Sequence, residues 1–435
     1  MNLRIAYMTG QYPRATDTFI RREVAALRAR GVHVETLAVR RPPADEAGGP
    51  ELDAERAATH YLVPCSPFQL AWAHLDLLAR SPRRYLHSLM TALIVRGPGL
   101  RSLIYQVFYF LEAGLVAQQM RRRRLAHLHN HFANSSCSVA MLAAQLGGFT
   151  FSFTIHGPAI FFEPAYWRLD AKVRRALFVC CISHFCRSQT MIWTPPEKWQ
   201  RLHIVHCGVD PDLFTPTEPS DGRSNLLFVG RLAAVKGLPM LLQAVAELRR
   251  DRPAVQLTVV GEGPDRVRLE ALASELEVAD RVRFVGYQSS AEVRRQLAHT
   301  DVFVMASFAE GVPVVLMEAM AAEVPVVATR LAGVSELVED GLSGYLVAPG
   351  DIQQLTERLA ALLDDPPGRR RMGSAGRAKV ERDFNLRYES DRLCRILTNA
   401  LAGQTSPIRP HPAEQAGAAP AAPVSVFACA KGSGP

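Results

Sequence analysis

The chain has 435 residues, of which 48% are hydrophobic and 21% are charged, and its formal net charge is +8. This length exceeds what one ordinary hydrophobic core needs, so it predicts two domains with additional segments. The composition excludes an intrinsically disordered chain and a protein built from membrane-spanning helices. We therefore expect a soluble globular protein.

The positive charge is concentrated in the first half of the chain. Residues 1–210 contain 25 Lys and Arg against 14 Asp and Glu, whereas the remainder contains 25 against 28. This imbalance predicts that the first half meets an anionic partner. Nucleic acid is disfavoured, because the basic residues are not interleaved with aromatic ones and no nucleic-acid-binding motif is present. Anionic lipid head groups or a phosphorylated acceptor are better candidates for this partner. Alternatively, the arginines have no partner and lie on solvated helix faces.

The cysteines and the N-terminus predict a cytoplasmic location. The eight cysteines form no C-x-x-C pair, which is typical of reduced thiols, and Cys181, His184 and Cys186 are an alternative metal-ligand set. The run Leu3–Met8 predicts a strand rather than a signal peptide. We expect no metal and no cofactor.

One long apolar stretch, Ser102–Ala117, predicts a helix. Gln106 and Glu112 interrupt it, and it is too short to span a bilayer. With Arg96 and Arg101 before it and residues 121–124, all arginine, after it, the helix could lie on the inner face of an anionic cytoplasmic membrane. The alternative is a core helix with a basic C-terminal cap that the helix dipole favours.

Strand-like apolar runs alternate with helical patterns, which predicts parallel sheets built from strand–helix–strand units. Asp17 or Thr18 can cap a helix over Phe19–Arg30, which Gly31 would end, and residues 41–49 predict an exposed loop. In the first half the expected strands are Arg4–Met8, Val32–Ala38, Leu125–His129, Thr150–Ile155, Leu177–Ile182 and His203–Val205.

A polar stretch rich in Pro, Ser and Gly, Thr215–Ser224, predicts a linker. Residues 1–215 and 216–402 would form two doubly wound, Rossmann-like α/β domains, with the last helix free to pack back on the first domain. Residues 403–435 predict a disordered tail. Ligands bind where the carboxyl ends of such strands face a cleft. In the second half the expected strands are Leu226–Val229, Gln256–Val260, Val282–Val285, Val302–Met305, Val326–Ala328 and Gly344–Val347.

The loop after the first strand of the second half carries two cations. Gly230 lets the backbone come close to a ligand, and Arg231 offers a planar fork that suits phosphate oxygens. Lys236 adds a compact second charge before Gly237. Charge-assisted hydrogen bonds contribute about 1.5–3 kcal/mol each, so the pair could select a diphosphate. An ordinary exposed loop is the alternative.

Two carboxylates flank the start of a later helix. Glu310 lies in the turn before Pro313, where the free amides around Gly311 and Val312 could face phosphate. Glu318 follows two turns later inside an apolar run, and a carboxylate there usually has a specific polar partner. Alternatively, Glu310 is only a favourable charge at the helix start, and Glu318 is a solvent-exposed residue.

Taken together, these motifs resemble the donor half of retaining, GT-B-fold glycosyltransferases of family 4. The resemblance covers roughly residues 226–397. Three segments of the first half are similar to bacterial exopolysaccharide glycosyltransferases of the colanic-acid type: Thr16–Ile20 after Gln11-Tyr-Pro13, His129-Asn-His131-Phe-Ala-Asn134 and Phe153-Thr-Ile-His156-Gly157. The motifs of the donor half are Phe228-Val-Gly-Arg-Leu232 with Lys236-Gly237, Val259-Val-Gly-Glu-Gly-Pro264, Val285-Gly286 and Glu310-Gly-Val-Pro with Glu318-Ala-Met-Ala321.

The resemblance implies a role for each matching position. Arg231 and Lys236 would stabilise the leaving diphosphate, Glu310 would hold the transferred sugar, and Glu318 would hold the ribose. His156 would reach the sugar from the first domain. Gly261 and Gly263 would make the close turn beside the nucleotide, and Gly286 and Tyr287 would present backbone groups to the base. The chain departs from the family at Cys207, where asparagine is common.

The implied reaction is transfer from a UDP- or GDP-sugar to a glycan or lipid-linked acceptor, with retention and without a metal. No pair of acids is placed like those of a glycosidase. A nucleotide-sugar epimerase, a phosphorylase and a non-catalytic protein that binds a glycan or nucleotide are the alternatives.

Overall fold

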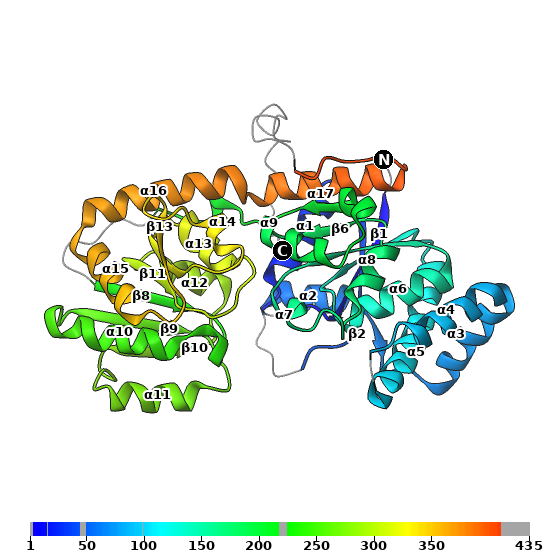
Figure 1. Cartoon of the computed structure of the whole chain (residues 1–435), viewed down its shortest axis with the longest axis horizontal. Helices are drawn as coiled ribbons and strands as arrows, with labels where there is room; N and C mark the ends of the chain where they lie inside the picture. The colour runs from blue at the N-terminus through cyan, green and yellow to red at the C-terminus, as the bar shows by residue number, and fades with distance from the viewer. Residues whose placement is uncertain (1–2, 15, 44–48, 98, 217–223, 410–435) are drawn as a thin grey trace, which may run out of the picture.

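The computed structural model describes residues 3–14, 16–43, 49–97, 99–216 and 224–409, which form two α/β domains (Figure 1). The N-terminal sheet has seven parallel strands in the order β3-β2-β1-β4-β5-β6-β7. Its strands are β1 Arg4–Gln11, β2 His33–Arg40, β3 His60–Val63, β4 His127–His131, β5 Thr150–Ile155, β6 Val179–Cys181 and β7 Leu202–Ile204.

Helices cover both faces of the N-terminal sheet. Along β1, Ala6 and Met8 face the core beneath α5 and α6, whereas Ile5 and Tyr7 face α1 and α17. The alternation follows from the two-residue period of a strand. The helices of this domain are α1 Thr18–Ala29, α2 Pro50–Ala58, α3 Pro67–Arg80, α4 Pro82–Ile94, α5 Leu100–Arg122, α6 Ser135–Gly147, α7 Ala159–Phe162, α8 Leu169–Arg175 and α9 His184–Ile192.

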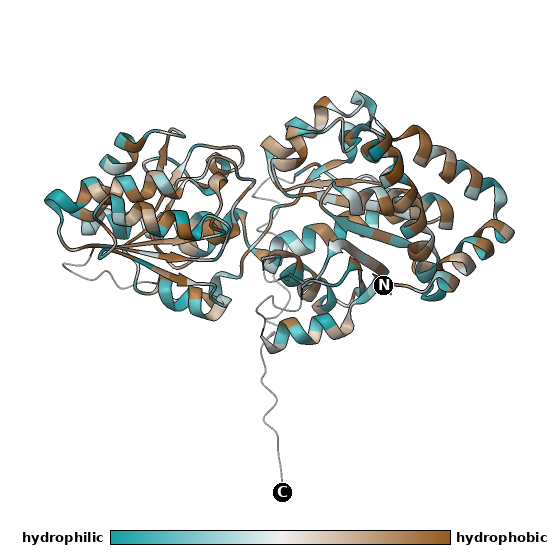
Figure 2. Ribbon diagram, turned by 90° about the horizontal axis from the view of Figure 1, so that it is seen from below, coloured by the Kyte–Doolittle hydropathy of each residue, from teal (hydrophilic) through white to brown (hydrophobic). Residues whose placement is uncertain are grey.

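The C-terminal sheet has six parallel strands in the order β10-β9-β8-β11-β12-β13, and these strands are largely hydrophobic (Figure 2). The predicted pair of doubly wound parallel sheets is confirmed. The strands are β8 Ser224–Val229, β9 Val255–Val260, β10 Val282–Gly286, β11 Val302–Met305, β12 Val326–Thr329 and β13 Gly344–Val347. The helices are α10 Leu238–Asp251, α11 Arg266–Glu275, α12 Ser290–Leu297, α13 Val314–Ala321, α14 Val334–Leu337, α15 Ile352–Asp364, α16 Pro366–Asp383 and α17 Leu386–Leu401.

The last two helices connect the domains (Figure 1). α16 packs on α13 of the C-terminal domain, and α17 packs on α1 of the N-terminal domain through Leu393, Ile396 and Leu397. The predicted linker falls largely on residues 217–223, outside the described residues, as do residues 44–48 of the predicted loop and residues 410–435 of the predicted tail. The expectation of a tail from Gly403 is wrong for its first part, because the Ile408 carbonyl accepts a hydrogen bond from the Ile204 amide and extends the edge of β7.

Two local expectations differ from the structure. β3 was not expected, because His60–Val63 is too short for a clear period. The histidine-rich strand β4 begins two residues later than predicted. Its polar side chains are buried because Thr150, Ser152 and Thr154 on the neighbouring β5 bond to His127 and His129.

The long apolar helix α5 has 23 residues and is apolar enough to cross a membrane by length and composition alone. Its second half is a core helix, with Ala113, Val116 and Met120 buried against α6. Its first half exposes Leu100, Ile104 and other apolar residues. The stretch is therefore a core helix for part of its length, with its basic end at residues 121–124.

Candidate active site

A lysine, a glutamate and a serine meet at the carboxyl edge of the C-terminal sheet. Lys236, at the end of the short η3 helix (Ala234–Lys236), donates a hydrogen bond to Glu310 Oε1 at 2.6 Å. The Ser307 hydroxyl, buried after β11, donates to the same oxygen at 2.6 Å. Because β8 and β11 are adjacent parallel strands, the loops that follow them lie at the same edge. The sequence prediction that Lys236 and Glu310 lie close together is consistent with this geometry.

Glycine allows the two loops to approach this closely. Gly237 has φ of +65°, and a Cβ at this position would lie 1.9 Å from the Ala306 carbonyl oxygen. A side chain at Gly237 would therefore push the β8 loop away from the end of β11, and Lys236 would move away from Glu310.

Arg231 lies exposed in the same loop, and its guanidinium has no hydrogen-bond or ion-pair partner among the described residues. A Cβ at Gly230, the residue before it, would lie 3.1 Å from the Phe228 ring and 3.9 Å from Lys236 Cε. The loop thus offers one unpaired cation, Arg231, and one cation, Lys236, that is paired with Glu310, so a diphosphate would have to compete with this carboxylate for the lysine.

Gly261 and Gly263 shape this loop from the neighbouring strand. A Cβ at Gly261 would lie 1.9 Å from the Gly230 carbonyl oxygen, and one at Gly263 would lie 2.1 Å from the Leu232 carbonyl oxygen. Both glycines therefore let the loop after β9 cross the loop after β8 in backbone contact. The Gly286 carbonyl accepts a hydrogen bond from the Gly261 amide, and the exposed Tyr287 follows it.

Glu318 has a partner from the other domain. Arg22 on α1 donates a hydrogen bond to Glu318 Oε1 at 2.7 Å, and both side chains are largely buried. The expectation of a specific polar partner for this carboxylate agrees with the structure, but the partner is an arginine 296 residues away in the sequence. A ribose would have to share Glu318 with Arg22 or displace it.

The N-terminal domain contributes a chain of hydrogen-bonded side chains. His156 follows β5, and its Nε2 lies 2.7 Å from His131 Nδ1 at the end of β4. Its other nitrogen, Nδ1, lies 3.5 Å from the Cys207 thiol. Both ring nitrogens of His156 are therefore engaged within the domain. The thiol is a weak partner, so Nδ1 is the atom that can most easily be given up to a ligand.

Behind His131 lies a buried acid. Tyr7 donates a hydrogen bond to Glu23 Oε1 at 2.8 Å, and the same oxygen lies 3.3 Å from His131 Nε2. Glu23, His129 and His131 are also close enough together to hold a metal ion. The His129 nitrogens already bond to Ser152 and Thr154. These hydrogen bonds therefore favour a polar network over a metal centre. The three residues of this group are not those of the alternative metal-ligand set considered from the sequence, Cys181, His184 and Cys186.

Burial determines the protonation of this network. Burial lowers the pKa of His156 well below its usual value, and the neighbouring His131 lowers it further. Burial also lowers the pKa of His131 to about 3 and raises the pKa of Glu23. The histidines are therefore neutral at pH 7, and His156 can serve as a hydrogen-bonding group without a charge.

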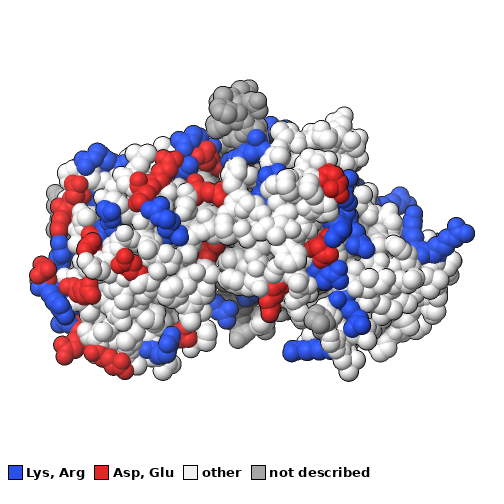
Figure 3. Space-filling model, in the orientation of Figure 1, with Lys and Arg blue, Asp and Glu red and all other residues white. Residues whose placement is uncertain are grey.

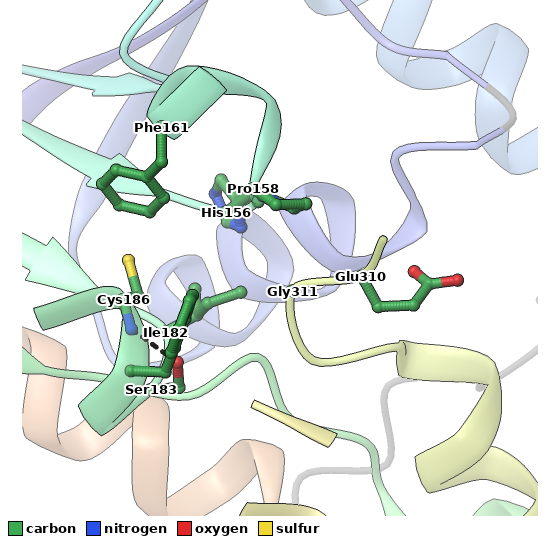
Figure 4. Close-up of a pocket in the computed structure, with 10 residues that line it drawn as sticks. His156, Pro158, Phe161, Ile182, Ser183, Cys186, Glu310 and Gly311 are labelled. Carbon is green, nitrogen blue, oxygen red and sulfur yellow. Dashed lines mark hydrogen bonds between the residues drawn. The ribbon is translucent and has the colours of Figure 1, made fainter. Parts of the chain in front are cut away.

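A cleft of about 180 Å³ lies between the domains (Figure 4). His156, Pro158 and Phe161 line it from the N-terminal domain, and Glu310 and Gly311 approach from the other side. A Cβ at Gly311 would lie 2.3 Å from the His156 carbonyl oxygen, so only glycine permits this approach. The Glu310 carboxylate points away from Phe161 and Cys186 (Figure 4).

A second carboxylate bridges the domains. Glu336 on α14 accepts hydrogen bonds from the His184 and Phe185 amides, both at 2.8 Å, at the start of α9. This contact and the pair between Arg22 and Glu318 hold the domains together.

Sequence reasoning had assigned no role to Arg22, Glu23, His131 or Glu336. Glu23 had a usable signal, because it lies on the same helix face as the buried Ile20, Val24 and Leu27. The partners of Arg22 and Glu336 lie far away in the sequence and had no such signal.

Comparison with known proteins gives this site a family. Residues 211–379 match the family model of glycosyl transferases group 1. The chain is 34% identical over 207 residues to WcaL of Escherichia coli, which is named for colanic acid biosynthesis, and the match covers 46% of this chain and 51% of that one. The chain thus spans about half the length of the curated relatives it matches.

Two solved structures share the whole fold. Sucrose-phosphate synthase of Thermosynechococcus elongatus superposes with a TM-score of 0.69 over 93% of this chain and 100% of its own, at 21% identity. HepE of Anabaena in complex with UDP-glucose has a TM-score of 0.69 over 91% of this chain and 100% of its own, at 18% identity. The GT-B fold expected from the motifs is confirmed. Residues 211–379 of this chain are therefore similar to the glycosyl transferases group 1, and the whole chain has a two-domain GT-B fold.

Proposed function

We propose that the chain is a retaining glycosyltransferase that moves a sugar from a UDP- or GDP-sugar to a growing, lipid-linked cell-surface polysaccharide or glycolipid. The observation that carries this proposal is the contact between Lys236 and Glu310 beside the unpaired Arg231, opposite His156 across the cleft. The name of the relative in colanic acid biosynthesis and the UDP-glucose bound to HepE support the donor and acceptor classes.

In the proposed reaction, the bond between the sugar C1 and the diphosphate oxygen breaks. The acceptor hydroxyl oxygen bonds to C1 on the same face, and its proton passes to the leaving diphosphate oxygen. Arg231 and Lys236 offset the negative charge that develops on the diphosphate. Glu310 holds the sugar hydroxyls, and no step calls on a metal or a cofactor.

The other site residues bind the donor. Glu318 accepts hydrogen bonds from the ribose hydroxyls, the Gly286 and Tyr287 backbone contacts the base, and the Gly311 and Val312 amides face phosphate. His156 reaches the sugar when its Nδ1 exchanges the Cys207 thiol for a hydroxyl. The domains approach each other so closely that a Cβ at Gly311 would lie 2.3 Å from the His156 carbonyl oxygen, so we propose that the domains separate to admit the donor.

Thermal stabilisation by nucleotide sugars tests the donor class. A saturating ligand at about 100 times its Kd adds about 2.7 kcal/mol, so UDP-glucose or GDP-mannose should raise the unfolding temperature by several degrees. The anomeric signal of the product, measured by NMR, should show the donor's configuration, and EDTA should leave the rate unchanged. No stabilisation by any UDP- or GDP-sugar would refute the donor class, and an inverted product would refute retention.

A further inference from the structure

The helices α3, α4 and α5 expose a large apolar surface that the proposed reaction does not use. Half of the 24 exposed large hydrophobic side chains among the described residues lie between residues 68 and 108. We call this surface, formed by the exposed apolar side chains of residues 68–108, the outer helical face. It includes Phe68, Trp72, Leu86, Met90, Leu100 and Ile104.

Two of these helices, α4 and the first half of α5, have an inverted pattern. α4 buries Ser88 and Thr91 and exposes Leu86, Met90 and Ile94, whose spacing places them along one side of the helix. In a helix on the surface of a water-soluble domain, the apolar side usually faces the core. Here the apolar side faces outward.

α5 shows the same inversion in its first half. It buries Ser102 and Gln106 and exposes Leu100, Ile104 and Phe108.

The buried polar groups of the two helices have partners. Ser88 donates a hydrogen bond to the Leu142 carbonyl at 3.1 Å, and Gln106 Nε2 donates to the Val95 carbonyl at 3.2 Å. Because these bonds fix the polar side inward, the outward orientation of the apolar side is specified by the fold.

The charges around the outer helical face are almost entirely positive. Residues 64–111 contain five arginines and one acid, Asp76. Asp76 is already paired with Arg80 and Arg121. Arg83 and Arg101 each lie one helical turn before an exposed apolar residue. In Figure 3, the end of the domain that α3, α4 and α5 form shows white and blue atoms and no red ones.

We propose that the outer helical face docks on an anionic lipid bilayer. Apolar side chains would enter the interface, and arginines on the same helices would reach the lipid phosphates. A second copy of the chain fits less well, because Arg83 and Arg101 of both copies would face a surface with no exposed acid to pair with them.

The outer helical face leads toward the candidate active site. Arg168, just before α8, donates a hydrogen bond to the Ile94 carbonyl at 3.4 Å, and the exposed Tyr166 lies beside Gly97. Phe162 on α7 is 71% exposed, and its neighbour Phe161 lines the cleft. A lipid-linked acceptor in the bilayer would thus meet the cleft mouth near Phe162, and this last step rests on the proposed function.

Sedimentation with lipid vesicles tests the docking surface. We expect the full chain to bind vesicles of phosphatidylglycerol and phosphatidylcholine, and to bind pure phosphatidylcholine much more weakly. The triple variant Trp72→Ser, Met90→Ser, Ile104→Ser should lower binding at least tenfold. Removing both Arg83 and Arg101 should lower it about 25-fold at low salt, because each basic residue near an anionic surface contributes about fivefold.

The C-terminal domain provides matched controls. Val267 and Leu342 are apolar residues that are 79% and 57% exposed, and replacing both with Ser should leave vesicle binding unchanged. Arg295 and Arg371 are equally exposed arginines, so their replacement should also have no effect.

Three results would overturn the docking proposal. They are equal binding to both vesicle types, unchanged binding by the triple variant, and a dimer in light scattering that the triple variant dissociates. Stabilisation by UDP-glucose is measured in parallel on the same proteins. If UDP-glucose does not stabilise the wild-type chain, that result contradicts the proposed function but does not bear on vesicle binding.

Discussion

Replacing Lys236 with Met tests the centre of the candidate active site. The substitution keeps the length of the side chain and removes its charge. Lys236 Nζ lies 2.6 Å from Glu310 Oε1, and only 22% of the lysine side chain and 11% of the glutamate side chain are exposed. After the change, the Ser307 hydroxyl is the remaining hydrogen-bond donor to that carboxylate among the described residues.

The structure predicts two effects of different size. The loss of one charge-assisted hydrogen bond should lower the free energy of unfolding by about 1.5–3 kcal/mol. Removing one preorganised donor to a developing negative charge usually costs about 2.7–4 kcal/mol in the transition state. We therefore expect kcat to fall by roughly 10²- to 10³-fold, while the protein remains folded at 25 °C.

The assay measures nucleotide release and transferred sugar, with urea unfolding in parallel. Lys379 provides a matched control, because its side chain is 14% exposed and pairs with two carboxylates, Glu339 and Asp383, that the proposed reaction does not use. Lys379→Met should lower stability by a similar amount and leave kcat nearly unchanged.

Two outcomes would contradict this reasoning. Turnover by Lys236→Met within fivefold of the wild type would show that the lysine does not stabilise the leaving group. An equal loss of kcat in Lys379→Met would show that the effect comes from stability. Lys236→Arg should retain more activity than Lys236→Met, because it keeps the charge but not the compact geometry.

Two further predictions concern the partner of Glu318 and the buried histidines. Glu318→Ala should weaken UDP binding about tenfold, whereas Arg22→Ala should strengthen UDP binding because it frees the Glu318 carboxylate. Calorimetry measures both affinities. Equal weakening by the two variants would show that the ion pair between Arg22 and Glu318 itself forms the binding site. Burial lowers the pKa of His127 and His131 to about 3, so protonation favours the unfolded chain as pH falls below about 6.5. The free energy of unfolding should drop by roughly 1.4 kcal/mol per pH unit for each histidine, and a urea midpoint equal at pH 7 and pH 5 would contradict this.

Local pattern determined most of the secondary structure. Val302–Met305 and Gly344–Val347 have the bounds that the sequence predicted, because each is a short, largely buried apolar run with clear ends, and Thr150–Ile155 has its predicted bounds too. The closeness of Lys236 and Glu310 was also predictable, since both follow parallel strands and parallel strands end at one edge of a sheet.

Only the tertiary structure decided which distant groups meet. The partners of Glu318 and of His156 lie 296 and 51 residues away, and no local pattern encodes such a pairing. The same holds for α4, whose sequence shows an apolar side and a polar side but not which of them faces the core. That choice depends on acceptors such as the Leu142 carbonyl, which only the packed fold brings to Ser88.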